Sequence, residues 1–522
     1  MPLPKWPPAI SPSQLEELRL IATTYALSHG LLYLPPGQQQ PPAPSSAIHA
    51  PFALFPSPFP RTLFTHAQDL QQIYNVLYAR VASDTEFLDR VLSAETAVGR
   101  VDEFVGTLWK IWKEVRSEGL VQPLQLGIFR SDYLLHEDGD GMDIKQVEFN
   151  TISASFGGLS QAVDGLHRYL MASTGYYSCS PILKESNVPP NNTLAEIVSG
   201  LAQAHKAYLQ SKLNSASNQG HPAQILFVTQ PNERNVFDQR PLEYELLNTY
   251  NIRVIRRTFE ELATQAHIQD STRVLLVDTS TSPDPVEVSV VYFRAGYTPV
   301  DYPTSTHFDT RKTLERSAAI KCPSLALQLA GSKKVQAVLS RPGVVETFIL
   351  SDRWAAISQD NPHSFTGEDV DGLRRSWMEM YGLEEEGAIE KARKDAQELV
   401  LKPQREGGGN NVYKGHIPEF LDGLSEKERE AWIAMALIKV PKGVENTLVR
   451  SGSEPVRANV VCELGIFGWA LFGYESDPST DGKKLKLEEG SGGYLLRTKG
   501  EDSDEGGVAT GFSVLDSVIL VD

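Results

Sequence analysis

The segment from Lys402 to Asn411, KPQREGGGNN, combines the residue types that bind phosphate and a divalent cation. Its three consecutive glycines lack a Cβ, so their backbone amides can close around an anion. Lys402 and Arg405 supply positive charge, and Glu406 supplies the hard carboxylate that Mg²⁺ prefers. A flexible surface turn is the alternative for a lone Gly-Gly-Gly. The charged and Asn-containing flanks favour a phosphate-binding loop instead.

A second candidate region is the segment Ile144–Asn150, whose alternating apolar and polar residues predict a half-buried strand. Because strand side chains repeat every two residues, Glu148 and Asn150 should point the same way. Together with Glu406, they form a ligand set sufficient for Mg²⁺, which usually takes a few protein oxygens plus phosphate oxygens.

Three lysines could neutralise the phosphates of a nucleotide: Lys333, Lys402 and Lys499. A solvated surface position is the commoner role for any one lysine, but Lys333 follows an apolar segment, Leu325–Leu329, which favours contact with a ligand. The residues alone therefore indicate a protein that binds a nucleotide with Mg²⁺ and an acidic or zwitterionic substrate. They do not reveal which bond is formed.

Bulk properties narrow the function class. The chain has 522 residues, too many for one core, and a formal net charge of −17, which argues against nucleic-acid and anionic-membrane partners. Three widely spaced cysteines fit a reducing compartment, so we expect a cytoplasmic protein. No apolar run approaches the roughly 20 residues of a membrane span. Neither a P-loop nor a Ser-His-Asp or Cys-His nucleophile pattern is present.

Several elements must position these side chains. Apolar periodicity predicts helices over residues 11–32 and between residues 65 and 120, and the proline-rich residues 34–60 should be extended or irregular. Short apolar runs between residues 223 and 326 alternate with helical patterns, which predicts a small parallel sheet in a subdomain of its own. Charged and Gly/Ser-rich residues 471–493 predict a mobile loop.

Exact sequence strings then point to a family. The ordered strings from about residue 49 almost to the C-terminus resemble those of eukaryotic glutathione synthetase. They are RSDY (130–133), VEFNTISASFGGL (147–159), ERNVFDQR (233–240), RAGYTP (294–299), KKVQ (333–336), KPQREGGGNN (402–411), ELGIFG (463–468), LLRTK (495–499) and GGVATG (506–511).

The resemblance implies a mixed α/β fold of the ATP-grasp type, with lid loops, and a homodimer. The expected parts are an ATP-grasp region 1–222 that includes the metal and substrate strand 144–158, an inserted βαβ substrate-binding subdomain 223–326, and a second ATP-grasp region 327–522 with glycine-rich loops 402–411 and 506–511. The implied reaction joins γ-glutamylcysteine to glycine. ATP first phosphorylates the cysteinyl carboxylate, and the glycine amine then attacks the acyl phosphate.

The resemblance also implies roles for individual residues. Glu148, Asn150 and Glu406 correspond to the Mg²⁺ ligands, and Arg497, Lys402 and Arg130 are expected to act in catalysis. The expected ATP-binding residues are Glu148, Lys333, Lys402, Pro403, Gln404, Arg405, Glu406, Gly407, Gly408, Gly409, Asn410, Asn411, Tyr413, Met435, Ala436, Leu437, Ile438, Glu463, Lys499 and Glu505. The expected substrate-binding residues are Arg130, Ile152, Ser153, Ala154, Ser155, Glu233, Arg234, Asn235, Gln239, Arg294, Ala295, Gly296, Tyr297, Arg497, Val508 and Ala509.

Three positions depart from the family pattern. Ala295 stands where an aspartate is common, and Met435–Ile438 lacks the glutamate usual at its second position. Thr510 replaces an alanine at the end of the site that receives the amine acceptor. One added hydroxyl changes selectivity modestly, by about 1–3 kcal/mol. Glycine is the expected acceptor, with β-alanine or serine as the alternative, and a non-catalytic sensing protein is disfavoured by the retained metal and phosphate residues.

Overall fold

The computed structural model describes residues 3–35, 47–139, 141–211, 223–357, 364–406, 409–477, 482–503, 506–508 and 511–522. The helices are α1 Pro12–Ser28, α2 Arg61–Ser83, α3 Thr85–Leu92, α4 Glu103–Glu118, α5 Gly157–Ser173, α6 Thr193–Gln210, α7 Val236–Tyr250, α8 Phe259–Gln265, α9 Ser305–Arg316, α10 Leu325–Ala330, α11 Lys333–Ser340, α12 Val344–Ile349, α13 Asp352–Ile357, α14 Gly367–Ser376, α15 Ala388–Lys394 and α16 Ile417–Gly423.

The strands are short at both ends of the chain and long in the middle of the main sheet. They are β1 Leu32–Tyr33, β2 Ile48–His49, β3 Phe52–Ala53, β4 Ser57–Pro60, β5 Leu124–Asp138, β6 Gly141–Asn150, β7 Gln224–Val228, β8 Val254–Arg257, β9 Ala266–Ile268, β10 Leu275–Val277, β11 Val286–Phe293, β12 Ile320–Cys322, β13 Met380–Gly382, β14 Leu399–Pro403, β15 Val412–Tyr413, β16 Trp432–Ala436, β17 Glu445–Val449, β18 Val456–Asp477, β19 Gly482–Gly500, β20 Ser513–Asp516 and β21 Val518–Val521.

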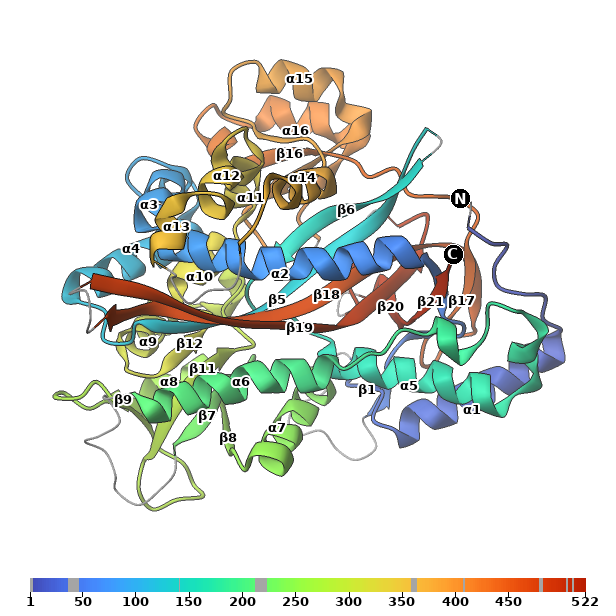
Figure 1. Ribbon diagram of the computed structural model, residues 1–522, viewed down its shortest axis with the longest axis horizontal. Coiled ribbons are helices and arrows are strands. Elements are labelled where there is room, and N and C mark those ends of the chain that lie inside the picture. The colour runs from blue at the N-terminus through green and yellow to red at the C-terminus, as the bar shows by residue number, and fades with distance from the viewer. Residues whose placement is uncertain are drawn as a thin grey trace.

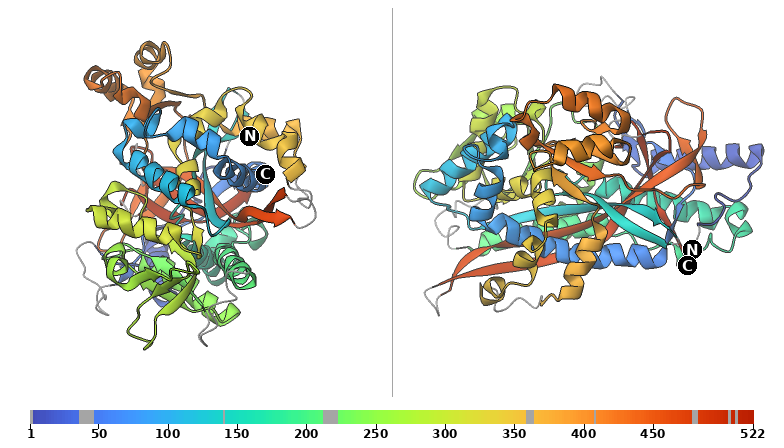
Figure 2. Two further views of the ribbon diagram at one scale, coloured as in Figure 1. Left: turned by 90° about the vertical axis from the view of Figure 1, so that its left-hand side faces the viewer. Right: turned by 90° about the horizontal axis from the view of Figure 1, so that it is seen from above.

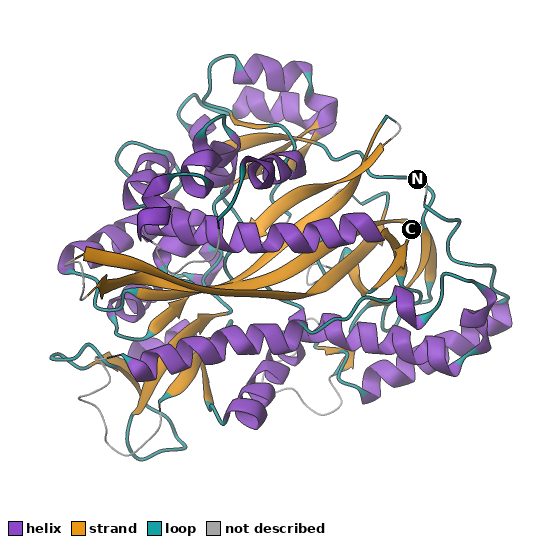
Figure 3. Cartoon of the chain, in the orientation of Figure 1, coloured by secondary structure: helices purple, strands orange, loops and turns teal. Residues whose placement is uncertain are grey.

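One large mixed sheet organises the molecule, in the order β17-β3-β20-β19-β18-β5-β12-β11-β10-β9, with β6 also paired to β5 and β7 and β8 joined through β11. Strand β5 is its centre, because it pairs with β18, β6 and β12. The helices lie on both sides of this sheet, as Figure 3 shows. The fold is therefore mixed α/β.

Strand alternation explains the two helical layers. A Cβ on Gly468 of β18 would meet Asn75 of α2, whereas the next residue, Trp469, packs against Gly200 of α6. Successive strand side chains point to opposite faces, so α2 and α6 cover opposite faces of β18. Figure 1 shows the two long helices on either side of the strands.

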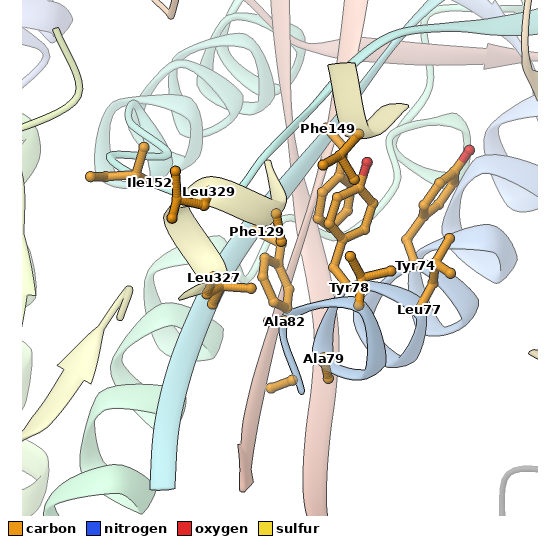
Figure 4. Close-up of a cluster of buried hydrophobic side chains, with 14 of the residues drawn as sticks. Tyr74, Leu77, Tyr78, Ala79, Ala82, Phe129, Phe149, Ile152, Leu327 and Leu329 are labelled. Carbon is orange, nitrogen blue, oxygen red and sulfur yellow. The ribbon is translucent and has the colours of Figure 1, made fainter. Parts of the chain in front are cut away.

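The same alternation orients the predicted ligand strand β6. Phe149 is buried and its ring stacks on Tyr78 of α2 with 4.0 Å between centroids. Figure 4 shows this aromatic cluster with Tyr74 and Phe129 around the Phe149 ring. Burying Phe149 against α2 directs Glu148 and Asn150 to the other face of the sheet, where both line a cavity.

The region 223–326 contains the parallel pairings expected of it, between β7 and β8, β7 and β11, and β11 and β12. Two pairings show that these strands do not form a separate, purely parallel sheet. Strand β10 runs antiparallel to β11, and β12 pairs with β5, so these strands continue the main sheet. The domain boundaries remain a prediction.

A second, four-stranded sheet has the order β13-β16-β14-β15 and packs with α15 and α16. Figure 2 places this unit at one end of the molecule and the green region 223–265 at the other, with the large sheet between them. Two smaller sheets pair β1 with β2 and β4 with β21.

Two predictions about individual segments had opposite outcomes. Ser11 caps α1 with a capping box, so the predicted helix start is confirmed. The prediction of a mobile loop for residues 471–493 is wrong. Strands β18 and β19 form a long antiparallel hairpin there, in which Leu471 pairs with Glu488 and the pairing continues to Asp477 with Gly482. Only residues 478–481 lie outside the described backbone. The alternating Leu485 and Leu487 pack against the core, which composition alone does not reveal.

Candidate active site

A cavity of about 710 Å³ lies between the four-stranded sheet and the large sheet. Its walls include β14 and β16 of the smaller sheet, β6, β18 and β19 of the larger one, and the loops that follow β6, β7 and β11. The sequence separation of these elements explains why no single motif encloses it. The sequence predictions place ATP near β14–β16 and the second substrate near β7 and β11, so these parts of the cavity are called the nucleotide end and the substrate end below.

Two carboxylates at the nucleotide end converge on one ammonium group. Lys333 Nζ lies 3.1 Å from Glu148 Oε2 and 3.1 Å from Glu406 Oε1. Lys333 is the first residue of α11 and is almost fully buried, so its charge cannot be solvated by bulk water. Burial alone would lower the pKa of Lys333, but the two carboxylates raise it.

The environment shifts the pKa values of Glu148, Glu406 and Lys402 in different directions. Burial would raise the pKa of Glu148, but Lys333, Lys402 and Arg497 hold it well below its usual value. Burial, together with the charge of Glu148, raises the pKa of Glu406 despite the attraction of Lys333. Burial lowers the pKa of Lys402 to about 8, and Lys333 adds to that effect. The cluster would be stabilised by further positive charge near Glu406.

The donor set fits Mg²⁺. Asn150 Nδ2 donates to the Arg130 carbonyl oxygen at 3.1 Å and to Asp132 Oδ2 at 3.0 Å, which leaves the amide oxygen of Asn150 for a ligand. Within the described ranges no three His, Cys, Asp or Glu side chains gather at one point. Two carboxylates and one amide oxygen would make a site that water or phosphate oxygens complete, as is usual for Mg²⁺.

Asp132 connects the two ends of the cavity, although the sequence analysis did not assign it a role. It is fully buried on β5 and accepts hydrogen bonds from Arg130, Asn150 and Arg497, the last at 3.0 Å. Arg497 also pairs with Glu463 across β18 and β19. The RSDY string contains Asp132, but only the register of three strands shows that it organises two arginines.

Close approach of β5 and β18 requires a glycine in the ELGIFG string. A Cβ on Gly465 would lie 2.7 Å from the Arg130 side chain and 2.8 Å from Asp132 Oδ1. Real Cβ contacts are not that short, so a larger residue would displace Arg130 or Asp132. Gly465 therefore keeps the space in which the buried ion pairs form.

The substrate end is built from three loops held by buried hydrogen bonds. Asp238 at the start of α7 accepts the backbone amides of Phe156 and Gly158 at 2.8 and 3.0 Å and pairs with Arg294 at 3.3 Å. Phe156 and Ser153 adopt the left-handed backbone region, with φ of 72° and 50°. Such conformations are strained in non-glycine residues. The hydrogen bond from the Phe156 amide to Asp238 holds Phe156 in this conformation.

Neighbouring side chains fix the other two loops. Glu233 accepts from the Asn235 amide at 2.8 Å and from Gln239 Nε2 at 2.7 Å. Asp301 Oδ2 accepts three consecutive amides, those of Gly296, Tyr297 and Thr298. The substrate-end groups are thus bound mainly to one another before any ligand arrives.

The apolar wall at the nucleotide end suits a flat heterocycle. Val400 and Met435 are paired across β14 and β16, and both line the cavity. The chain leaving β16 is tied to β5 by two bonds: the Lys439 amide donates to His136 Nδ1 at 3.1 Å, and the Glu137 amide donates to the Lys439 carbonyl at 2.7 Å. His136 therefore positions the chain next to Met435–Ile438, which was predicted to bind ATP.

Most of the predicted site residues lie around this one cavity. The predicted residues that line it are Arg130, Glu148, Asn150, Ile152, Ser153, Ser155, Glu233, Arg234, Asn235, Arg294, Tyr297, Lys333, Lys402, Arg405, Glu406, Asn410, Asn411, Tyr413, Met435, Ala436, Leu437, Ile438, Glu463, Arg497, Lys499 and Val508. Predicted residues outside the lining are Ala154, Gln239, Ala295, Gly296, Pro403, Gln404 and Gly409. Gly407, Gly408, Glu505, Ala509 and Thr510 lie outside the described residues.

Some residues outside the lining support those inside it. Gln404 accepts the Lys334 amide at 2.9 Å and donates to the Ala431 carbonyl, so it fixes the base of the glycine-rich segment to α11. The lining also includes residues for which no individual role was predicted, although Gly506 and Gly507 belong to the expected glycine-rich loop 506–511. They are Tyr33, Leu134, Val147, Phe156, Gln230, Asn232, Val400, Lys414, Val440, Val461, Glu501, Ser503, Gly506 and Gly507.

Comparison with known proteins places this geometry in a family. The family model "Eukaryotic glutathione synthase, ATP binding domain" matches residues 12–520. The chain belongs to the eukaryotic glutathione synthases. The chain is therefore an ATP-dependent ligase, and its cavity is a candidate active site of that family.

Individual relatives of this synthase family match along almost the whole chain. Glutathione synthetase large chain of Schizosaccharomyces pombe is 37% identical over 527 residues, with 98% of each chain covered. Glutathione synthetases of Bos taurus and Homo sapiens are each 38% identical over 511 residues, which is 97% of this chain and 96% of each relative.

A solved structure supports the fold. The apo form of a glutathione synthetase-like effector from Globodera pallida has a TM-score of 0.71 at 23% identity, with 98% of each chain covered. This likeness shows that the two chains share the synthase fold. No helix in the described ranges has both the length and the apolar character needed to cross a bilayer.

Proposed function

We propose that this chain is a glutathione synthetase that joins γ-glutamylcysteine to glycine and converts ATP to ADP and phosphate. The observation that carries the proposal is the convergence of Glu148 and Glu406 on Lys333, beside Lys402 and facing the preformed substrate end of the same cavity. The names of the relatives support glycine as the acceptor. The alternative acceptors rested on Thr510, which lies outside the described residues.

ATP would bind at the nucleotide end, with its base against Val400, Met435 and the segment that follows β16. Lys333, Lys402 and Lys499 would neutralise its phosphates under the glycine-rich loops 402–411 and 506–511. Glu148, Asn150 and Glu406 would hold Mg²⁺, which when bound offsets phosphate charge during transfer. Lys333 would then exchange its carboxylate contacts for phosphate contacts.

γ-Glutamylcysteine would bind with its γ-glutamyl part against Glu233, Arg234 and Asn235 and its cysteinyl carboxylate near Arg130 and Arg497. A carboxylate is a poor acyl donor, so phosphoryl transfer to it must precede attack by the amine. Arg497 lies beside Glu148 and can neutralise the charge that develops on the reacting carboxyl group. Positioning and charge neutralisation replace a protein nucleophile.

The finer architecture belongs to the same proposal. The four-stranded sheet and the large sheet would act as the two halves of an ATP-grasp fold, with 1–222 and 327–522 forming that fold and 223–326 carrying the substrate-binding insertion. The enzyme would be a cytoplasmic homodimer. Support for a reducing compartment comes from the sequence, which has three widely spaced cysteines.

One assay tests the proposal. ADP release is measured with γ-glutamylcysteine and Mg²⁺ while the acceptor is glycine, β-alanine or serine. We expect turnover that depends on both substrates and is fastest with glycine. Absence of ADP release with every acceptor would contradict the ligase function, and faster turnover with β-alanine would contradict the glycine assignment.

A further inference from the structure

The N-terminal strand β1 contributes a side chain to the substrate end of the cavity. Tyr33 is 95% buried yet lines the same cavity as Glu233, Arg234 and Asn235. Burial raises the pKa of Tyr33 to about 12 against the influence of Arg234, and the Glu233 carboxylate adds to the increase. The phenol therefore lies among the charged side chains of the β7–α7 loop, about 200 residues away in the chain.

Tyr33 at the end of β1 and the next residue, Leu34, hold Arg234 from two sides. The Arg234 guanidinium carbon lies 4.9 Å from the centroid of the Tyr33 ring, within the range of a cation–π contact. Arg234 Nε donates to the Leu34 carbonyl at 3.1 Å, and the Leu34 amide donates to the Arg234 carbonyl at 3.2 Å. The guanidinium plane is thus fixed by the ring on its face and by a carbonyl at Nε.

The other cavity arginines already have carboxylate partners. Arg294 pairs with Asp238 and donates to the Ala154 carbonyl, and Arg130 pairs with Asp132 through two nitrogens. Among the described ion pairs, none joins Arg234 to a carboxylate. Arg234 is consequently the guanidinium at the substrate end that is best placed to bind a carboxylate from a ligand, which guanidinium groups bind in a bidentate manner.

We propose that Tyr33 is a specificity-determining residue whose ring positions Arg234 to bind the α-carboxylate of the γ-glutamyl group. This inference rests on the proposed function, which supplies γ-glutamylcysteine as the substrate. Tyr33 acts through Arg234 and is a positioning residue. Its ring, and not its hydroxyl group, is the part that the arrangement needs.

The test compares donor substrates with and without the α-carboxylate. The second donor is 4-aminobutyrylcysteine, in which the γ-glutamyl carboxylate is replaced by hydrogen; where it turns over slowly, its inhibition constant against γ-glutamylcysteine is measured. The variants are Tyr33→Ala, Tyr33→Phe and, as a matched control, Tyr25→Ala. Tyr25 is on α1 and stacks on His29 and Tyr169, outside the cavity lining.

Tyr33→Ala should raise KM for γ-glutamylcysteine about fivefold, equivalent to about 1 kcal/mol, with kcat and KM for ATP unchanged. Tyr33→Phe should keep the original KM because the ring remains. With 4-aminobutyrylcysteine the unmodified chain and Tyr33→Ala should have equal constants, and Tyr25→Ala should match the unmodified chain with both donors.

The outcomes separate the inference from the function on which it rests. If the unmodified chain releases no ADP, the proposed function fails. If it turns over normally and Tyr33→Ala leaves KM for γ-glutamylcysteine unchanged, or weakens both donors equally, the role of Tyr33 is overturned. An effect of Tyr33→Phe as large as that of Tyr33→Ala would overturn the role of the ring.

Discussion

The two ends of the cavity hold their charges in different ways. At the substrate end, Arg294, Asp238 and Glu233 are nearly fully buried and are bonded to backbone amides and to one another. At the nucleotide end, Glu148 and Glu406 are partly exposed and share one ammonium group. The side chains of the substrate end are therefore already held by hydrogen bonds and ion pairs within the protein. At the nucleotide end, a bound cation and a ligand can replace the contacts between Lys333 and the two carboxylates.

This difference separates stability from turnover. Removing the partner of a buried charge is strongly destabilising, so substitutions at the substrate end should lower the free energy of unfolding. Glu148 and Glu406 repel each other and share Lys333, so removal of one carboxylate leaves Lys333 paired with the other and should cost little stability. Variants at the substrate end should therefore mainly lower stability, and variants at the nucleotide end should mainly lower turnover.

The largest effect on turnover is expected from Glu406→Ala. Loss of a predicted Mg²⁺ ligand should lower the rate of ADP release by more than about 100-fold. The melting temperature should stay close to that of the unmodified chain, because Lys333 keeps its contact with Glu148. The control is Glu384→Ala, which removes the partner of Lys334 and does not alter the cavity lining. Near-normal turnover of Glu406→Ala would show that the metal assignment is wrong.

The largest effect on stability is expected from Asp238→Ala. This change orphans the buried Arg294 and releases the amides of Phe156 and Gly158, so the free energy of unfolding should fall by about 3–5 kcal/mol. Thermal or urea unfolding measures it. Where enough folded protein remains, KM for γ-glutamylcysteine should rise and KM for ATP should not. A variant as stable as the parent would mean that this end is not preformed.

A smaller effect is expected from His136→Ala, which removes one hydrogen bond to the chain next to Met435–Ile438, the segment predicted to bind ATP. One such bond is worth about 1 kcal/mol, so KM for ATP should rise about fivefold while KM for γ-glutamylcysteine is unchanged. Steady-state kinetics with each substrate varied in turn provide the comparison. Equal changes in both constants would indicate that the two ends are not independent.

The smallest effect concerns Asp516, which is buried on β20 beside β19. It accepts from Ser57 at 2.7 Å and Thr498 at 2.6 Å, and burial raises its pKa to about 7. The folded state therefore holds a proton that the unfolded state releases near pH 4, so this contribution to stability is lost as pH rises from about 4 to about 7.

Asp516→Asn should remove that dependence. The difference in unfolding free energy between the variant and the parent should change with pH inside this window and level off above it. Cys462 and Tyr177 lie near Asp516, and burial raises the pKa of both groups, so neither titrates in the same range. His167, which contacts Ser517 and whose pKa burial lowers to about 4, is present in both proteins, so its contribution cancels in the difference. Parallel stability curves for the two proteins would contradict the assignment.

Much of the nucleotide end could be predicted from sequence, because its residues stand in compact strings and its strand has a clear period. Glu148 and Asn150 followed directly from alternation along β6. Asp132 and Tyr33 could not be predicted in the same way. Their roles depend on the register of β5 against β18 and on the contact of β1 with a loop about 200 residues later.

The error at residues 471–493 has a related cause. Glycine, serine and charge normally indicate a loop, but here each strand of the hairpin supplies the backbone partners of the other. Leu485 is buried although its neighbours are charged. Local composition therefore misses a strand whose stability comes from a partner strand and from a few alternating apolar contacts.

The bond between Asp132 and Arg497 joins residues 365 positions apart. During synthesis, β5 must therefore remain without its partner on β18 and β19 until most of the chain has been made. Contacts of such long range slow folding because the loop they close must be ordered first. The pair of Asp132 and Arg497 therefore cannot form until β19 has been made, so a partly made chain lacks the arginine that we propose acts on the reacting carboxyl group.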